Sequence, residues 1–145
     1  MTDPAKAPFA AVRLDDIVVV TDIDPDYPDA TDGDFHLVRR HFDIRSFGVN
    51  GITGGAGDEM EPHHEADDEE NGTNGHEELF AVVSGHAVFT VDGQDVDAPA
   101  GTLVFVRDPA LIRSARATVD GTSILAVGGR PGVAYELSRW EQSLP

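Results

Sequence analysis

The stretch HEELFAVVSGHAVFTVDGQDVDAPAGTLVFV, residues 76–106, decides the fold of this 145-residue chain. β-Branched and aromatic residues dominate its apolar runs, and turns that contain glycine or proline separate the runs. This pattern is typical of short consecutive strands. We predict three of them here, at residues 78–83, 86–91 and 102–106.

The second of these strands has the clearest alternation. Ala87, Phe89 and Val91 fall on one face, because successive side chains of a strand point to opposite sides of its sheet. The Asp-Gly pair at 92–93 follows and favours a tight hairpin, since glycine adopts positive φ without strain. Residues 102–106 form a short apolar run, which predicts a strand buried on both faces.

The spacing of five residues in this stretch matches two known motifs. Glu78 is followed by six residues and Gly85, and Gly93 is followed by five residues, Pro99, one residue and Gly101. These spacings resemble the two motifs of the cupin family. The resemblance implies an all-β fold, a jelly-roll barrel of two packed antiparallel sheets. It leaves the activity open, because cupins host many chemistries on one barrel.

The resemblance covers roughly residues 35–135. Three shorter segments are similar to small bacterial single-domain cupins of undefined activity, namely FGVN at 47–50, FVRDPA at 105–110 and GGRPG at 128–132. We therefore expect three parts of the chain. They are an N-terminal arm with one strand and an acidic loop (1–34), the cupin barrel (35–135) and a C-terminal tail (136–145).

The remaining strands are predicted from their apolar, β-branched composition. They lie at residues 17–20, 35–42, 43–50, 112–118 and 122–127. Residues 134–140 are predicted as a short helix or strand, and no long stretch elsewhere has helical periodicity. Phe35, Leu37, Ile44 and Phe47 are expected to point inward.

The metal-ligand pattern of the cupin motifs is incomplete in this chain. The His-x-His pair of the first motif is absent just before Glu78, and Ile112 and Arg113 stand where the second motif has its histidine. Two of the usual ligands are therefore missing or displaced. Ile112 in that place is expected to add an apolar surface to the cavity.

His76 and Glu78 form the best candidate pair for chemistry. Residues two apart on a strand share a face, and the resemblance places the motif glutamate inside the barrel, so both side chains are expected to point inward. A third ligand would come from the adjacent pair His63 and His64, and we prefer His64 because similar proteins place a histidine before an acidic residue such as Glu65.

The resulting candidate metal site is His64, His76 and Glu78. Two imidazoles and one carboxylate suit a divalent ion such as Fe, Mn, Ni or Zn, with open positions for water or substrate. A metal-free pocket and a barrel filled by Phe80, Val82, Phe89 and Phe105 are the alternatives.

The charge of the chain excludes several classes of partner. Asp and Glu number 27 against 10 Lys and Arg, which gives a formal net charge of −17. Such a chain repels nucleic-acid phosphates and anionic membrane surfaces, so neither partner is expected. The absence of cysteine excludes disulfides and thiolate metal sites. Without an apolar run long enough to span a membrane or a secretory signal, we expect a cytoplasmic location.

Three polar segments have two interpretations each. Residues 22–34 are predicted as a solvated Asp-rich connector, with calcium binding as the alternative. Residues 66–73 are an acidic insertion at the barrel mouth, either a lid or a disordered loop. Arg39, Arg40 and Arg45 are expected to face solvent, or else to anchor a carboxylate ligand.

Three functions follow as hypotheses. The first is a small-molecule-binding cupin with a degenerate or absent metal site, and the second is a metal-dependent cupin enzyme of dioxygenase or isomerase type. The third is an interaction protein that dimerises through its sheets. In each case we expect a homodimer, with the apolar segment 17–20 available to extend a partner's sheet. The sequence does not identify the ligand.

Overall fold

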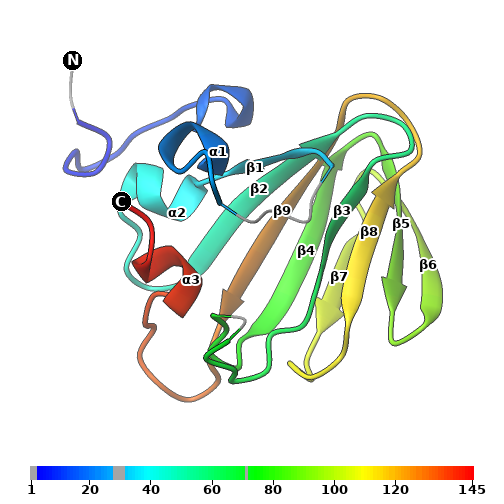
Figure 1. Ribbon diagram of the computed structural model, residues 1–145. Coiled ribbons are helices and arrows are strands. Elements are labelled where there is room, and N and C mark those ends of the chain that lie inside the picture. The colour runs from blue at the N-terminus through cyan, green and yellow to red at the C-terminus, as the bar shows by residue number, and fades with distance from the viewer. Residues whose placement is uncertain (1–2, 28–31, 71) are drawn as a thin grey trace.

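The computed structural model describes residues 3–27, 32–70 and 72–145, and within them the chain forms two facing antiparallel sheets (Figure 1). One sheet has the strand order β1-β2-β9-β4-β7, and the other has the order β3-β8-β5-β6. This arrangement confirms the expected all-β fold class. The strands are β1 (Asp34–His36), β2 (Gly48–Gly54), β3 (Glu59–His63), β4 (Glu77–Ser84), β5 (His86–Val91), β6 (Gln94–Pro99), β7 (Leu103–Val106), β8 (Arg113–Ala117) and β9 (Thr122–Gly129).

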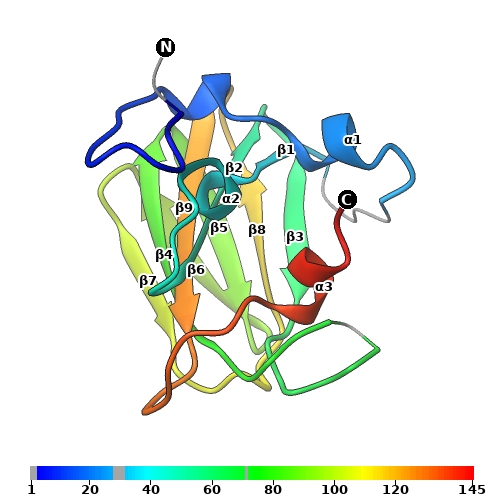
Figure 2. The same cartoon turned by 90° about the vertical axis from the view of Figure 1, so that its left-hand side faces the viewer.

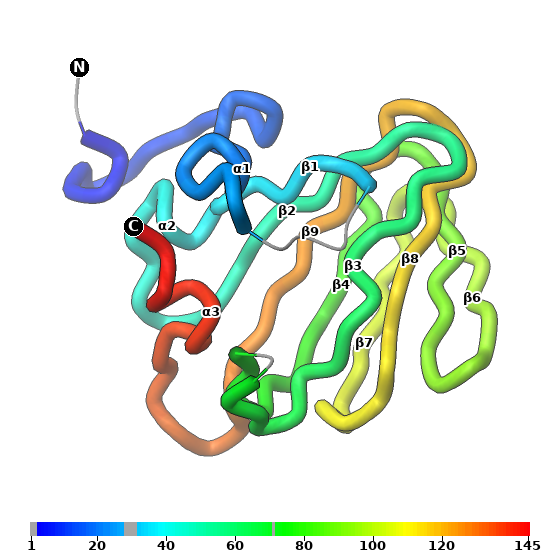
Figure 3. The backbone as a smooth tube through the Cα atoms, in the orientation of Figure 1, coloured from blue at the N-terminus to red at the C-terminus, as the bar shows by residue number. Residues whose placement is uncertain are grey.

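The helical segments of the described residues are short and lie together on the β1–β2 side of the molecule (Figure 2). The tube view shows the C-terminus returning to this side (Figure 3), where the side chain of Arg40 in α2 donates to the backbone oxygen of Pro145. The elements are a 3₁₀ turn at Leu14–Asp16 and the helices α1 (Val20–Ile23), α2 (Val38–Phe42) and α3 (Arg139–Gln142).

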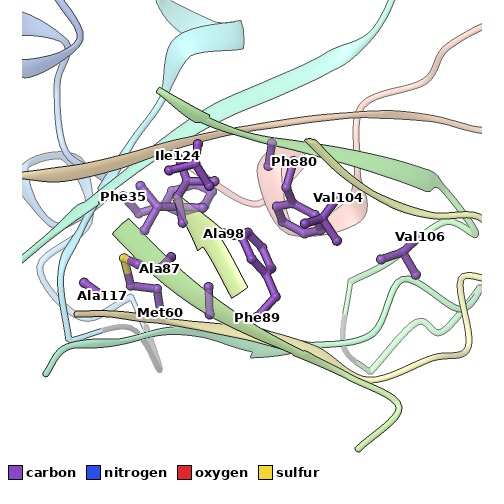
Figure 4. Close-up of a cluster of buried hydrophobic side chains, with 14 of the residues drawn as sticks. Phe35, Met60, Phe80, Ala87, Phe89, Ala98, Val104, Val106, Ala117 and Ile124 are labelled. Carbon is purple, nitrogen blue, oxygen red and sulfur yellow. The ribbon is translucent and has the colours of Figure 1, made fainter. Parts of the chain in front are cut away.

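The apolar core fills one end of the space between the sheets. Figure 4 shows side chains from both sheets meeting there, with Met60 and Ile124 among them. The rings of Phe80 and Phe89 face each other across the sheets with centroids 5.3 Å apart. Phe89 comes from the alternating face of β5 predicted above, whose members Ala87 and Phe89 are both buried. The opposite end of the barrel holds polar side chains instead.

The predictions for residues 17–20, 35–42 and 102–106 each need a correction, although the last of these segments is a strand as predicted. Residues 17–20 do not form a strand but pass from the 3₁₀ turn into α1, with Ile17 and Val20 buried against their own chain. Only an isolated bridge joins Val19 to His36. An apolar run signals burial, and in this segment burial occurs without strand pairing. The homodimer stays a prediction, but this segment is already packed within its own protomer.

The segment 35–42 is only briefly a strand. Strand β1 ends at His36, and α2 follows, closed by Asp43 in the left-handed conformation at φ 51°. The side chains of Phe35 and Leu37 are buried, as predicted, whereas Phe47 is 42% exposed. Arg39, in the helix that follows, is buried as well.

Strand β7 is buried on one face, not on both. Val104 and Val106 point into the core, whereas Leu103 and Phe105 are 65% and 45% exposed. The strand is the edge of its sheet, with an uncovered outer face. Phe105 therefore does not fill the barrel, and its ring instead lies beneath the guanidinium of Arg107.

Gly85 should be more sensitive to substitution than Gly93. Both have positive φ, at 74° and 76°. A Cβ on Gly85 would lie 2.6 Å from the Cα of Thr122, whereas one on Gly93 would meet nothing within 4 Å. We expect Gly93→Ala to cost about 1 kcal/mol of unfolding free energy from backbone strain alone. Gly85→Ala should cost at least about 2 kcal/mol more, because Thr122 must move.

Chemical denaturation of the two variants beside the parent protein measures the difference. Equal losses would mean that the close approach of Gly85 to Thr122 is not a constraint on this fold.

Candidate functional site

A cavity of about 170 Å³ occupies the polar end of the barrel. Its walls come from the starts of β2 and β4, the ends of β3 and β9, and the segment that leads into α3. Pockets for drug-sized ligands measure roughly 300–1,000 Å³, so this cavity suits a smaller molecule. Glu65 lines the cavity too, as does Thr73 of the acidic insertion.

Two paired glycines leave space above the sheet on the side of the cavity. Gly48 of β2 lies opposite Gly128 of β9 in the antiparallel register. A Cβ on Gly48 would lie 3.0 Å from the hydroxyl of Tyr135, and one on Gly128 would lie 3.6 Å from Cβ of His76. The missing side chains therefore allow Tyr135 and His76 to lie over the sheet.

A charged cluster closes the inner side of the cavity. Nε2 of His63 lies 2.9 Å from Oε1 of Glu65 and 3.2 Å from Oε1 of Glu78. Nδ1 of the same ring lies 2.7 Å from the backbone oxygen of Glu61. Carboxylates and carbonyls only accept hydrogen bonds, so both ring nitrogens donate and His63 is an imidazolium in this arrangement.

Arg113 supplies the second cation of the cluster. Its guanidinium donates from Nη1 to Oε1 of Glu78 at 3.1 Å and from Nε to the backbone oxygen of Leu111 at 3.0 Å. The side chain is 1% exposed, which makes it one of the most deeply buried in the protein. Ile112, expected to add an apolar surface to the cavity, is 65% exposed, and Arg113 points inward in its place.

The pKa values of the cluster follow from these contacts. Burial alone would lower the pKa of His63, but hydrogen bonds to Glu65 and Glu78 outweigh it and raise that pKa well above 6.5. Burial would raise the pKa of Glu78, but the contacts with His63 and Arg113 lower it below 4.5. The cluster is thus a set of ionised groups that stabilise one another.

The structure brings together some of the residues that the sequence suggested. His76 is buried and lines the same cavity as Glu78. His64 lies outside the cavity lining, 27% exposed, with Nε2 3.7 Å from a carboxylate oxygen of Asp68. The group whose donor atoms lie within 4.8 Å of one another is instead His63, Glu65 and Glu78. Metal binding by His64, His76 and Glu78 stays a prediction.

A β-bulge explains why His63 and not His64 points inward. The register between β3 and β8 shifts between Met60 and His63, and Glu61 within that interval has φ 46°. An extra residue in one strand turns the following side chains to the opposite face. Strict alternation from the buried Met60 would have placed His64 inside.

The candidate site also contains residues that sequence reasoning missed. Glu65 is only 8% exposed, whereas the sequence suggests a role for it only as the acidic neighbour of His64. The sequence marks Arg113 only as a departure from the motif and suggests no role for Asn50 or Tyr135. One signal is available: Arg113 shares a strand face with Ala115 and Ala117, and a charge that is buried with them requires a partner.

The arginine cluster divides between surface and interior. Arg45 is exposed and pairs with Asp43, as expected for a solvent-facing arginine. Arg39 is 5% exposed and pairs with the buried carboxylate of Glu141 in α3, which corrects the solvent-facing prediction. This ion pair fastens the C-terminal segment to α2.

The acidic insertion is fastened to the same segment. Arg139 donates from its backbone nitrogen to Oδ1 of Asn74 at 3.0 Å and from Nη1 to Asp67 at 2.8 Å. The backbone nitrogen of Trp140 donates to the oxygen of Gly72 at 3.1 Å. Asn71 of this insertion and residues 28–31 of the Asp-rich connector lie outside the described residues. Thr73 of the insertion lines the cavity.

Solved structures with a similar fold are numerous. A cupin protein of Bacteroides fragilis superposes with a TM-score of 0.55 at 18% identity, covering 77% of this chain and 85% of the other. The chain has the cupin fold. A sugar phosphate isomerase of the cupin superfamily from Silicibacter pomeroyi gives a TM-score of 0.59 at 15% identity, covering 83% and 76% of the two chains.

A protein of Photorhabdus luminescens gives the same TM-score of 0.59 at 14% identity, covering 84% of this chain and 87% of that one. No protein-family model and no curated protein matches the sequence. At these identities the likeness establishes the cupin fold and leaves the activity to the site. Among the described residues, no helix has the length and apolar character needed to cross a membrane.

The buried ion pair of Arg113 and Glu78 should be far more important for stability than an exposed one. Arg113→Met leaves Glu78 with one cation fewer, and we expect it to cost about 3 kcal/mol of unfolding free energy. The double variant Arg113→Met/Glu78→Gln should lose less than the sum of the single variants, because the two groups depend on each other. Denaturant titrations give all these values.

The control is Asp67→Asn, which breaks the ion pair with Arg139 whose side chains are 55% and 36% exposed. It should cost less than about 1 kcal/mol. If Arg113→Met cost no more than this control, the buried cluster would not be a stabilising element.

Stability should fall on the alkaline side because of His63. Its pKa is raised on folding, so its contribution is complete below pH 6.5 and is lost as the pH rises through the higher folded-state pKa. Glu78, with a lowered pKa, contributes above pH 4.5 and loses that contribution as the pH falls through its folded-state value. The unfolding free energy, measured across this range, should therefore decline above pH 6.5.

His63→Gln should flatten that alkaline decline. His86→Gln is the matched control, because His86 pairs with Asp97 at the surface, with side chains 36% and 74% exposed. If the unfolding free energy of His63→Gln still declined above pH 6.5, another group would be responsible for the decline.

Proposed function

We propose that this chain is a small-molecule-binding cupin whose cavity works without a resident metal ion. The observation that carries the proposal is the position of Arg113. Its guanidinium lies beside Glu78, in the region where the cupin motif has a histidine ligand. An arginine side chain stays protonated and has no lone pair to offer, so it cannot take the place of that ligand.

The charge of Arg113 also works against a metal ion at Glu78. Arg113 and His63 both contact the same oxygen, Oε1 of Glu78. A divalent ion bound to that oxygen would displace one of these donors and would lie close to the fixed charge of the guanidinium. In a buried setting such repulsion is weakly screened. The two protein cations satisfy the carboxylate that a metal would otherwise use.

The cavity itself supports ligand binding. It combines apolar and aromatic walls with a few convergent polar groups, which is the usual composition of a small-molecule site. One fold neighbour is named a sugar phosphate isomerase, so the cupin fold hosts small-molecule chemistry at least in that protein. The identity of this chain to it is 15%, and the activity is not transferred.

A second candidate is a metal-dependent enzyme of the dioxygenase or isomerase type. Its specific support is the group of His63, Glu65 and Glu78, whose donor atoms lie within 4.8 Å of one another. Nδ1 of His63 is already held by the backbone oxygen of Glu61, the kind of support that orients a histidine ligand. After loss of its Nε2 proton, this set could bind Fe, Mn, Ni or Zn.

Elemental analysis of protein purified without chelator or nickel resin separates the two candidates. The metal-free proposal expects Fe, Mn, Ni and Zn well below one ion per chain. Stoichiometric metal that disappears in His63→Gln or Glu78→Gln would overturn it in favour of the enzyme. Loss of metal in His76→Ala would instead support the ligand set suggested by the sequence.

The variant Arg113→His tests whether the guanidinium of Arg113 is the reason that the site disfavours a metal ion. It replaces the guanidinium by an imidazole next to Glu78 and should raise the affinity for added Zn or Ni, measured by titration calorimetry. Arg107→His is the matched control, because Arg107 lies at the surface over Phe105. Equal affinities in both variants would mean that Arg113 is not what disfavours metal.

The binding half of the proposal is tested by fluorescence. Trp140 is the only tryptophan of the chain and lines the cavity. Titration with neutral polyols, sugar phosphates, carboxylates and amines should produce a saturable change for at least one class, unaltered by chelator. No response to any class would count against the proposed function.

A further inference from the structure

One buried polar atom in the cavity lacks a partner. Oδ1 of Asn50 makes no hydrogen bond within the residues that the structure describes, although the residue is only 9% exposed. Asn50 lies on β2, two residues from Gly48, and lines the cavity. An unsatisfied buried amide is costly, so native proteins usually provide a partner for each such group.

Three further polar side chains around the cavity are available for hydrogen bonding. His76, Tyr135 and Ser138 line it, and their side chains form no hydrogen bond with any residue in the described part of the chain. The rings of His76 and Tyr135 pack with centroids 5.7 Å apart. Burial, followed by the nearby carboxylate of Glu141, raises the pKa of Tyr135 to about 12, so its hydroxyl keeps its proton.

These four groups share a hydrogen-bonding character. An amide, an imidazole, a phenol and an alcohol can each donate and accept. The groups that complement all of them are hydroxyls, which also donate and accept. A hydroxyl satisfies the amide of Asn50 whichever way its oxygen and nitrogen are assigned.

The charges around the cavity disfavour an anionic ligand. Four carboxylates line it, those of Glu61, Glu65, Glu78 and Glu141. The nearby cations are already engaged, since Arg113 and His63 contact Glu78 and Arg39 pairs with Glu141. A phosphate or carboxylate on the ligand would have to break one of these buried pairs.

An aromatic wall completes the site. The ring of Trp140 meets the edge of Phe35 at 5.6 Å and of Tyr27 at 6.3 Å between centroids, and all three line the cavity. Such a surface packs well against the C–H groups of a carbon skeleton that carries hydroxyls on its other side.

From these observations we infer that the cavity binds a small uncharged polyhydroxy compound, a polyol or monosaccharide, whose hydroxyls bond to Asn50, His76, Tyr135 and Ser138. The inference rests on the proposed function and narrows it to a ligand class. It sets this chain apart from a binder of phosphorylated sugars, because every cation near the cavity already has a carboxylate.

The experiment is a set of Trp140 fluorescence titrations with paired probes. Glycerol is compared with glycerol 3-phosphate, D-glucose with D-glucose 6-phosphate, and D-glucose with its 2-deoxy analogue. We expect the uncharged member of each phosphate pair to bind at least about tenfold more tightly, and the 2-deoxy analogue to bind more weakly than glucose.

Asn50→Leu then separates a ligand contact from a structural role. It should weaken binding of the best probe about threefold to tenfold while leaving the denaturation midpoint unchanged or raised, because no protein hydrogen bond is lost. Asn74→Leu is the matched control, since Asn74 accepts a bond from Arg139 and its loss should lower the midpoint. Tyr135→Phe, which keeps the ring, should weaken binding in the same way as Asn50→Leu.

The outcomes distinguish this inference from the proposed function. Tighter binding of the phosphates, or of carboxylates or amines, would overturn the polyhydroxy class while leaving a small-molecule site in place. A lowered midpoint in Asn50→Leu with unchanged binding would assign Asn50 to an ordered water and overturn the inference. No fluorescence change with any probe would contradict both the polyhydroxy ligand class and the proposed small-molecule binding.

Discussion

A buried guanidinium must have a carboxylate, and in this protein the pairing of Arg113 with Glu78 determines how the polar end of the barrel is built. Glu78 stands at the start of β4 and Arg113 at the start of β8, in different sheets, so their contact joins the two layers where apolar packing stops. His63 then adds a second proton donor to the same carboxylate oxygen. On the inner wall of the cavity, the charges of Arg113 and His63 are therefore paired with carboxylates of the protein itself.

The two ends of the barrel are stabilised by different interactions. At the core end, side chains such as Phe80 and Phe89 exclude water and pack at close range. At the cavity end, the glycine pair Gly48 and Gly128 leaves the sheet surface bare, and polar side chains from outside the sheets lie over it. The cavity stays open because ion pairs and loops hold the side chains around it. These interactions do not require the side chains to fill the space.

Period-two alternation and turn chemistry predicted individual strands, and the resemblance to the cupin motifs implied the barrel. Phe89 on an alternating strand and Gly93 in an Asp-Gly turn are local signals, and both lie as expected. The prediction of the site residues failed where tertiary contacts determine which side chains point inward. Because of the bulge before His63, His63 points inward and His64 does not. The burial of Arg113 depends on Glu78, which is far away in the sequence. Neither the bulge nor the pairing has a signature within its own segment.

Two walls of the cavity come from segments outside the strands of the barrel. The segment from Glu65 through the acidic insertion brings Glu65 and Thr73 to the cavity, and the C-terminal segment brings Tyr135 and Trp140. These two segments hold each other through Arg139 and the backbone of Trp140. Loops on a rigid scaffold can change without loss of the fold, so ligand choice can vary in them while the strands stay fixed. If the cavity binds a ligand as proposed, its selectivity depends on a loop and a tail that contact each other, so a change in either one is expected to affect both walls.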